Sequence, residues 1–167
     1  MLTKHSRWYA PLAATAVALL MASPAVAAPD NLLPAADSCG DFDLGLSASG
    51  GTIREIQFGN GNLYKIGSGV ILTWSNEGLA GGASNGKTYT VNTSGSVSRY
   101  VKNPDGTYSL TLTGHNGFVF FASDAGGPGA YVYTGRVVLT VDSPTANNVL
   151  SVDASAGKVV DVCQLLR

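Results

Sequence analysis

The stretch Lys87–Ala122, KTYTVNTSGSVSRYVKNPDGTYSLTLTGHNGFVFFA, decides the fold because short segments rich in Val, Thr, Tyr and Phe alternate in it with turn residues. Asn103-Pro104-Asp105-Gly106 has proline where a turn requires its fixed φ, and glycine where a left-handed residue forms the bulge of a hairpin. Asn116-Gly117 is typical of a type I′ hairpin turn. With a further turn at Thr93-Ser94-Gly95, these signals predict a meander of consecutive antiparallel strands.

The predicted turns also imply a register between these strands. Val101 is expected opposite Tyr108, and Arg99 opposite Leu110 on one side and Tyr89 on the other. This register places Arg99 in the middle of an apolar face made by Tyr89, Val91, Val97, Val101, Tyr108, Leu110 and Leu112.

A charge in that position has two interpretations, because an unpaired buried charge is costly. In the first, which we favour, Arg99 lies near a sheet edge, stacks on Tyr89 and keeps its guanidinium in water. In the second, Arg99 lines an anion-accepting pocket and is a ligand contact.

The rest of the chain repeats the same pattern of short apolar segments between Gly, Asn, Asp, Ser and Pro, without a helical repeat. The expected strands are Asp41 to Leu46, Ile53 to Phe58, Leu63 to Ile66, Val70 to Ser75, Thr88 to Asn92, Val97 to Val101, Thr107 to Thr113, Phe118 to Ala122, Tyr131 to Val141, Val149 to Val152 and Val159 to Cys163. Within Tyr131 to Val141, Gly135 indicates a bend or a close backbone approach. The fold class is therefore all-β, an antiparallel β-sandwich, with a small β-barrel as the alternative.

The first residues have the pattern of a secretory signal peptide. Lys4, His5 and Arg7 are followed by an apolar segment, Leu12 to Met21, and a small-x-small site at Ala25-Val26-Ala27. The apolar segment is shorter than the roughly 20 residues that a spanning helix needs. The sequence thus predicts a signal peptide at 1–27, a single all-β domain at 28–167, an extracellular product and no membrane span.

Removal of this leader leaves eight basic and eleven acidic residues, a net charge of −3. Nucleic-acid-binding proteins carry basic patches or stripes, so we expect no nucleic-acid partner. The two cysteines, Cys39 and Cys163, can form only one intramolecular pair, and export favours its oxidation. We expect this disulfide to join the two ends of the domain.

Few residues point to catalysis. His115 is the single histidine after the leader and is the candidate base of a secreted hydrolase, although a catalytic triad is recognised by a geometry that the sequence does not supply. Asp37, Asp41 and Asp43 could offer oxygen ligands to Ca²⁺, but they lack the spacing of an EF-hand loop. We therefore expect no catalytic residue, metal or cofactor, and the hydrolase stands as an alternative.

Binding residues are easier to suggest. The glycine-rich segment Ser123 to Ala130, which contains Asp124, is expected to be a mobile contact loop. Tyr100 is the best exposed aromatic side chain for stacking on a sugar ring, whereas Trp74 is expected in the core. A protease-inhibitor loop at Gly126 to Gly129 is a second alternative, which the flexibility of glycine disfavours.

Five stretches of the chain are considered together: Gly86 to Thr93, Asn103 to Thr107, Gly114 to Asn116, Tyr133 to Val138 and Asp161 to Cys163. In their order they resemble a family of small secreted actinobacterial all-β proteins of unknown function. The resemblance implies export and a β fold, and it adds Arg136 beside His115 as a residue worth testing. The predicted function is a secreted, non-catalytic binding or surface-interaction module of unknown ligand, for which a cell-wall glycan and an extracellular protein are the candidate partners.

Overall fold

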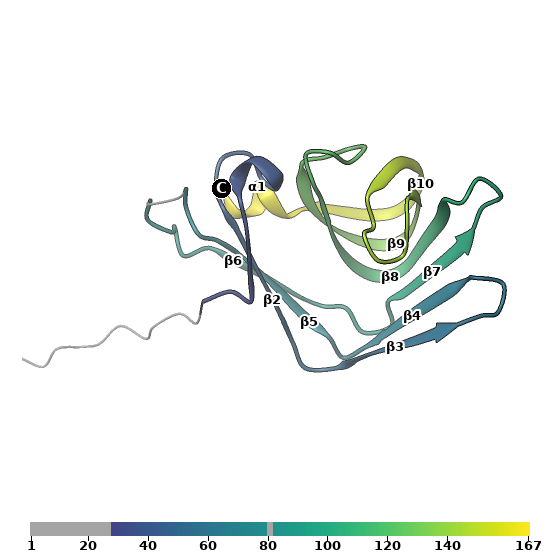
Figure 1. Cartoon of the computed structure of the whole chain (residues 1–167). Coiled ribbons are helices and arrows are strands. Elements are labelled where there is room, and N and C mark those ends of the chain that lie inside the picture. Colours follow the sequence, from purple (N-terminus) through teal and green to yellow (C-terminus); the bar gives the residue numbers. More distant parts are fainter. Residues whose placement is uncertain (1–27, 80–81) are drawn as a thin grey trace, which may run out of the picture.

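The computed structural model describes residues 28–79 and 82–167, so the predicted signal peptide lies outside the described residues (Figure 1). The described chain forms antiparallel strands, one short 3₁₀ turn at Ala35–Asp37 and one short helix, α1. The elements are β1 (Asn31–Leu33), β2 (Leu44–Ser49), β3 (Thr52–Gln57), β4 (Leu63–Ser68), β5 (Ile71–Asn76), β6 (Thr88–Asn92), β7 (Val97–Lys102), β8 (Tyr108–Phe120), β9 (Gly129–Val141), β10 (Val149–Asp161) and α1 (Val162–Leu166).

The strands make two sheets, which we call sheet A and sheet B. Sheet A has four strands in the order β1-β2-β5-β6, and sheet B has six in the order β10-β9-β8-β7-β4-β3. Every strand pair is antiparallel. The predicted antiparallel sandwich is confirmed, and the alternative of a closed barrel is wrong.

Three connections carry the chain from one sheet directly into the other. β2 continues into β3 through Gly50-Gly51, β4 into β5 through Gly69-Val70, and β6 into β7 through residues 93–96. Gly51 has φ +61°, and a Cβ atom there would lie 2.3 Å from the backbone nitrogen of Val70. Only glycine fits this crossing, where two backbones approach closely.

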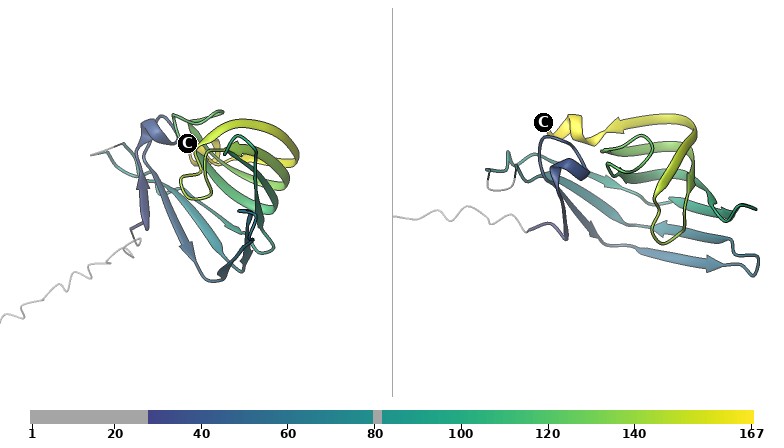
Figure 2. Two further views of the ribbon diagram at one scale, coloured as in Figure 1. Left: turned by 45° about the vertical axis from the view of Figure 1, so that its right-hand side comes forward. Right: turned by 45° about the horizontal axis from the view of Figure 1, so that its top comes forward.

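A row of glycines across β8, β9 and β10 bends sheet B. Gly114 on β8 pairs with Gly135 on β9, which pairs with Gly157 on β10. All three have positive φ, and a Cβ on Gly135 would lie 2.3 Å from the carbonyl oxygen of Ala156. The expectation of a close approach at Gly135 is confirmed. Beyond this row, β8, β9 and β10 curl over the other strands, green to yellow in Figure 2.

The curl separates two hydrophobic clusters. The first lies between sheet A, α1 and the far ends of β8 to β10; its buried members are Cys39, Phe42, Leu44, Trp74, Ala130, Val132, Val162, Cys163 and Leu166. The second lies on the concave side of sheet B and consists of Tyr100, Leu110, Leu112, Phe120, Val137, Leu139, Val141 and Val149. Trp74 is a core residue as expected, 1% exposed, and its Nε1 has no hydrogen-bond acceptor in the described chain.

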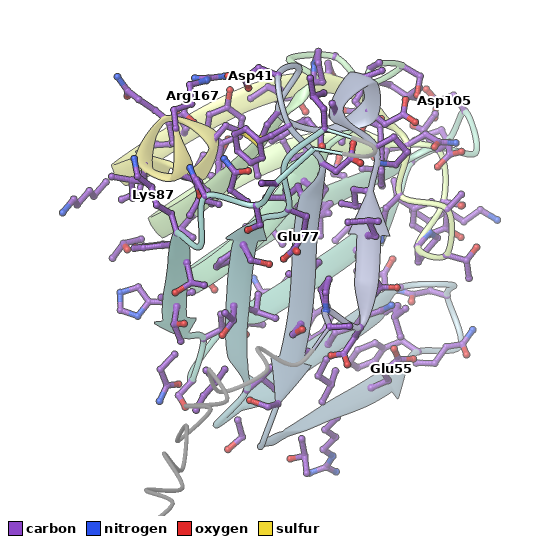
Figure 3. All side chains as sticks on the ribbon, turned by 90° about the vertical axis from the view of Figure 1, so that its left-hand side faces the viewer. Asp41, Glu55, Glu77, Lys87, Asp105 and Arg167 are labelled. Atoms are coloured by element: carbon purple, nitrogen blue, oxygen red, sulfur yellow. A yellow bond between two sulfur atoms is a disulfide. The ribbon has the colours of Figure 1, made fainter. Side chains whose placement is uncertain are left out.

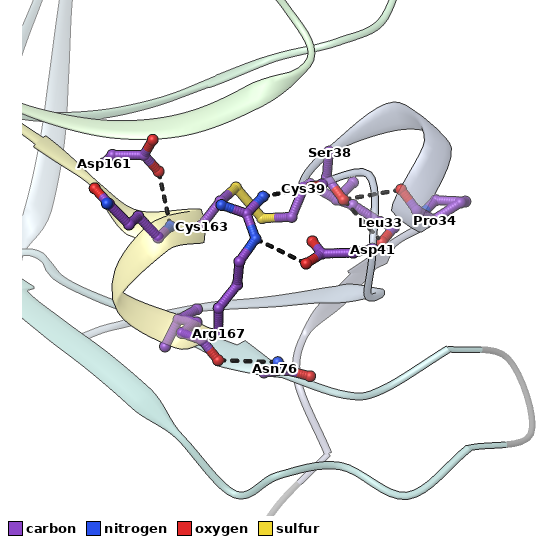
Figure 4. The surroundings of a disulfide bond; sticks show 11 residues. Leu33, Pro34, Ser38, Cys39, Asp41, Asn76, Asp161, Cys163 and Arg167 are labelled. Atoms are coloured by element: carbon purple, nitrogen blue, oxygen red, sulfur yellow. Dashed lines mark hydrogen bonds and ion pairs between the residues drawn. A yellow bond between two sulfur atoms is a disulfide. The ribbon is translucent and has the colours of Figure 1, made fainter.

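The predicted disulfide is present between Cys39 and Cys163, 124 residues apart in sequence (Figure 4). Arg167 follows α1, and its Nε donates to Asp41 Oδ2 over 2.7 Å. This hydrogen bond lowers the pKa of Asp41 below its ordinary value. Asn76 Nδ2 donates to the carbonyl oxygen of Leu166 over 3.0 Å. The disulfide and the Arg167–Asp41 pair hold α1 against the segment that precedes β2, and the bond from Asn76 holds it against the end of β5.

The predicted register between β7 and β8 is wrong by one residue. Lys102, not Val101, lies opposite Tyr108, and Arg99 lies opposite Thr111. The loop closes through a hydrogen bond from Asn103 N to Thr107 O, so both residues belong to the turn. A shift of one residue reverses the faces of a strand. Arg99 is therefore on the exposed face, and Tyr100 takes its place in the core.

The predicted meander is also wrong in two places. β6 pairs with β5 and not with β7, because Thr93–Ser96 carries the chain into the other sheet. Asn116-Gly117 is not a turn, since β8 runs unbroken from Tyr108 to Phe120. The two predicted strands Val149 to Val152 and Val159 to Cys163 are one strand, β10, which runs without a break to Asp161. The side chain of Asp161 caps α1 by accepting from Gln164 N.

Candidate functional site

The outer face of sheet B brings together two of the sequence-predicted contact residues, Arg99 and Arg136. Strand pairing places Arg54, Ile66, Val97, Thr113 and Arg136 in one row across β3, β4, β7, β8 and β9. The next row contains Ile56, Tyr64, Arg99, Thr111 and Val138. We call these two rows the basic face. Side chains alternate along a strand, so this face is opposite the concave side that holds Tyr100, Leu110 and Leu112.

All three arginines of the basic face are exposed. Across residues 28–79 and 82–167, the two ion pairs are Lys65 with Glu55 and Arg167 with Asp41, so no carboxylate pairs with Arg54, Arg99 or Arg136. The guanidinium groups therefore keep their five N–H donors each for solvent or a ligand.

Arg99 is oriented by an aromatic neighbour. Its guanidinium carbon lies 4.9 Å from the ring centre of Tyr64, and Phe58 packs against the same ring edge-on at 4.8 Å. A cation over an aromatic face is attracted to it and can still donate hydrogen bonds outward. The first interpretation of Arg99 is right that the guanidinium is exposed and stacks on an aromatic ring. It is wrong in two respects: the ring is Tyr64 and not Tyr89, and β7 is an inner strand of sheet B and not a sheet edge.

Tyr100 is not an exposed sugar platform. It is 3% exposed, and its hydroxyl donates to Asn147 Oδ1 over 2.9 Å. Burial raises the pKa of Tyr100 above its ordinary value. The Nζ atom of Lys65 lies 5.6 Å from the centre of its ring. Tyr100 is therefore a core residue that fastens the loop between β9 and β10.

His115 lies at a different place, in a hollow where the two sheets meet. The hollow has a volume of about 160 Å³. It is lined by Ile53, Lys65, Gly67, Val70, Leu72, Thr93, Ser96, Ser98, His115, Asn116 and Gly117. His115 is exposed, and within the described part of the chain its imidazole makes no hydrogen bond to a carboxylate.

Two of the acidic residues considered as Ca²⁺ ligands bind other groups of the protein. Asp43 Oδ1 accepts from Ala35 N over 2.8 Å, and Asp41 pairs with Arg167. Figure 3 shows Asp41 and Arg167 together at one end of the molecule and Glu55 at the other. Among the residues that the structure describes, no three His, Cys, Asp or Glu side chains gather as metal ligands would.

Asp124 is buried and serves the structure of its loop. Its Oδ2 accepts from Phe121 N over 2.7 Å, and its Oδ1 accepts from Val149 N over 2.8 Å. Ala125 N also donates to Val149 O over 2.9 Å. The carboxylate thus ties the glycine-rich segment to the start of β10, and both of its oxygens are already engaged.

Replacement of Asp124 by asparagine is expected to lower the free energy of unfolding by about 2 kcal/mol, because an amide keeps one acceptor and turns a donor toward a backbone N–H. Urea denaturation followed by tryptophan fluorescence measures this change. Asp37→Asn is the matched control, since Asp37 is exposed and we expect it to change stability by less than about 0.5 kcal/mol. Equal effects of the two substitutions would contradict the structural role of Asp124.

The third arginine, Arg54, was missed by sequence reasoning. The Asn60-Gly61 turn indicates the pairing of β3 with β4, but β4 and β7 are not consecutive strands, and no turn motif indicates the pairing that brings Arg54 onto the same face as Arg99. A second signal is the alternation that places Arg54 and Ile56 on one side of β3. It becomes informative only when the neighbouring strands are known.

Comparison of the chain with protein-family models, with curated proteins and with solved structures found no match.

Proposed function

We propose that this protein is an exported, non-catalytic binding module that contacts its extracellular partner through the basic face. The observation that carries the proposal is the presence of three exposed arginines on one uncovered sheet face, with no carboxylate paired to them in the described chain. α1 packs against β9, β6 and β5 at the other end of the fold. The basic face is therefore open to a partner.

Export is supported by two independent features. The first residues have the charge, apolar segment and cleavage pattern of a signal peptide. The Cys39–Cys163 bond is of the kind that forms and persists in oxidising compartments. No helix in the described residues is long and apolar enough to cross a membrane. The resemblance to small secreted actinobacterial proteins agrees with this proposal.

A binding role suits the site better than hydrolysis does. Catalytic groups must lie within hydrogen-bond reach of one another, as a nucleophile and its base do. The hydrogen bonds of the described carboxylates go to backbone groups, hydroxyls, amides and Arg167. The hydrolase centred on His115 stays an untested alternative, as does the protease inhibitor.

The binding role predicts that protein purified from the culture medium sediments with isolated cell walls, and that the variant R54Q/R99Q/R136Q sediments about tenfold less. Glutamine keeps much of the side-chain length and removes the charge. Lys102→Gln is the control, because Lys102 is an exposed cation outside the basic face. Equal sedimentation of the triple variant and the unmodified protein, or no binding to walls, glycans or extracellular proteins, would overturn the proposal.

A further inference from the structure

The basic face has the charge spacing of a site for a long polymer. Arg54 and Arg136 are in the same row, and the order β3-β4-β7-β8-β9 separates them by four strand spacings, about 19 Å. Arg99 is on β7, midway between them and two residues along the strand direction. Neighbouring arginines are thus about 12 Å apart at their Cα atoms.

Resting on the proposed function, we propose that the basic face binds an anionic polysaccharide whose chain crosses strands β3 to β9. A small anion would occupy one guanidinium, whereas an extended chain contacts all three. A guanidinium recognises carboxylate, sulfate and phosphate groups through paired N–H donors.

The aromatic residues of the face favour an anionic glycan over a neutral one. Neutral sugars commonly stack on a free aromatic ring, but the ring of Tyr64 already has Arg99 over its face and Phe58 against it. The ligand therefore meets guanidinium groups rather than an open ring. Charge, and not stacking, is the main source of affinity.

The residues between the arginines suit a sugar chain. Thr111 and Thr113 lie on the basic face between Arg99 and Arg136, and both are partly exposed. Their hydroxyl groups can donate to and accept from sugar hydroxyls.

The net charge of the chain directs an anionic ligand to the basic face. The chain without its predicted leader has a net charge of −3, and a polyanion is repelled by most of such a surface. Glu55, the carboxylate on β3, pairs with Lys65 on the opposite side of the sheet from Arg54. An anionic chain is therefore attracted to the basic face and away from the rest.

Titration of the exported protein with dextran sulfate, and with unmodified dextran of equal length, tests the proposal by calorimetry. Dextran sulfate is expected to bind, and dextran to bind at least about 100-fold more weakly. Binding should weaken about tenfold between low and physiological salt, because exposed charges are screened. Each of R54Q, R99Q and R136Q should lower affinity about fivefold, and the triple variant about 100-fold.

Lys102→Gln removes the same charge elsewhere and should lower affinity less than twofold. The melting temperature of every variant shows that the fold is intact. Dextran sulfate affinity that is unchanged in the triple variant would overturn the proposal, and so would single-stranded DNA binding equally well. Binding to cell walls that depends on the arginines, without binding to dextran sulfate, would leave the binding module standing and reject the anionic ligand.

Discussion

Replacement of both Cys39 and Cys163 by alanine is expected to lower the free energy of unfolding by about 4 kcal/mol. The bond joins residues 124 apart, and a loop of this length restricts the unfolded chain by roughly 4–5 kcal/mol in the chain-entropy account. Both cysteines are also buried in the apolar cluster between sheet A and α1, so alanine at these positions leaves no buried polar group without a partner. Guanidinium denaturation of the oxidised protein and the double variant measures the difference.

Reductant provides the control for this experiment. It should destabilise the unmodified protein by a similar amount and leave the double alanine variant unchanged. The remaining contacts of α1, through Arg167 with Asp41 and Asn76 with Leu166, are not covalent and do not replace the bond. A difference below about 1 kcal/mol would show that these contacts hold the chain ends by themselves.

Gly135→Ala is expected to destabilise the protein by about 3 kcal/mol or to prevent folding. Gly135 has φ +133°, which disfavours a side chain, and the added Cβ would lie 2.3 Å from Ala156 O and 3.1 Å from the Cα of Gly157. Both neighbours are backbone atoms, so the strands must separate to make room. Thermal denaturation followed by circular dichroism measures the loss.

Gly106→Ala separates the cost of a positive φ from the cost of the steric overlap. Gly106 has φ +91° in the turn between β7 and β8, and a Cβ there meets no atom within 4 Å. Its replacement should cost about 1–2 kcal/mol, the backbone contribution alone. If the substitution at Gly135 cost no more than the one at Gly106, the close approach of the three strands would not be required.

The strands themselves could be predicted from the sequence because apolar alternation and turn residues are local signals. Ile53 to Phe58 and Thr88 to Asn92 were expected as strands and are β3 and β6 within a residue. The Cys39–Cys163 pair followed from there being no other cysteine. These expectations depended on short segments or on simple counting, not on distant packing.

The face that each strand presents was harder to predict, as Arg99 and Tyr100 show. Their exposure depends on whether the turn after Lys102 contains one residue more or fewer, and the motif at Asn103–Gly106 allows both. The burial of Tyr100 against Leu110 selects the observed register. An arginine within an otherwise apolar face was itself the sign that the other register was correct.

Glycines also led to a wrong prediction, because a glycine can mark a tight turn or permit close packing within a strand. Asn116-Gly117 has the sequence of a tight turn, but Gly117 instead lets β8 pass Trp74, where a Cβ would lie 2.5 Å from the indole ring. Asn116 is buried, and its Nδ2 donates to Thr113 O. A turn residue and a residue that permits close packing look the same until the opposite layer is known.

Three pairs of consecutive strands are divided between the two sheets, and this connectivity affects how the molecule unfolds. Two hydrophobic clusters would ordinarily suggest two units that melt separately. Here β2–β3, β4–β5 and β6–β7 each belong to both sheets, so loss of one sheet pulls directly on the other. We therefore expect cooperative, all-or-none denaturation, in which neither sheet survives as a partly folded intermediate.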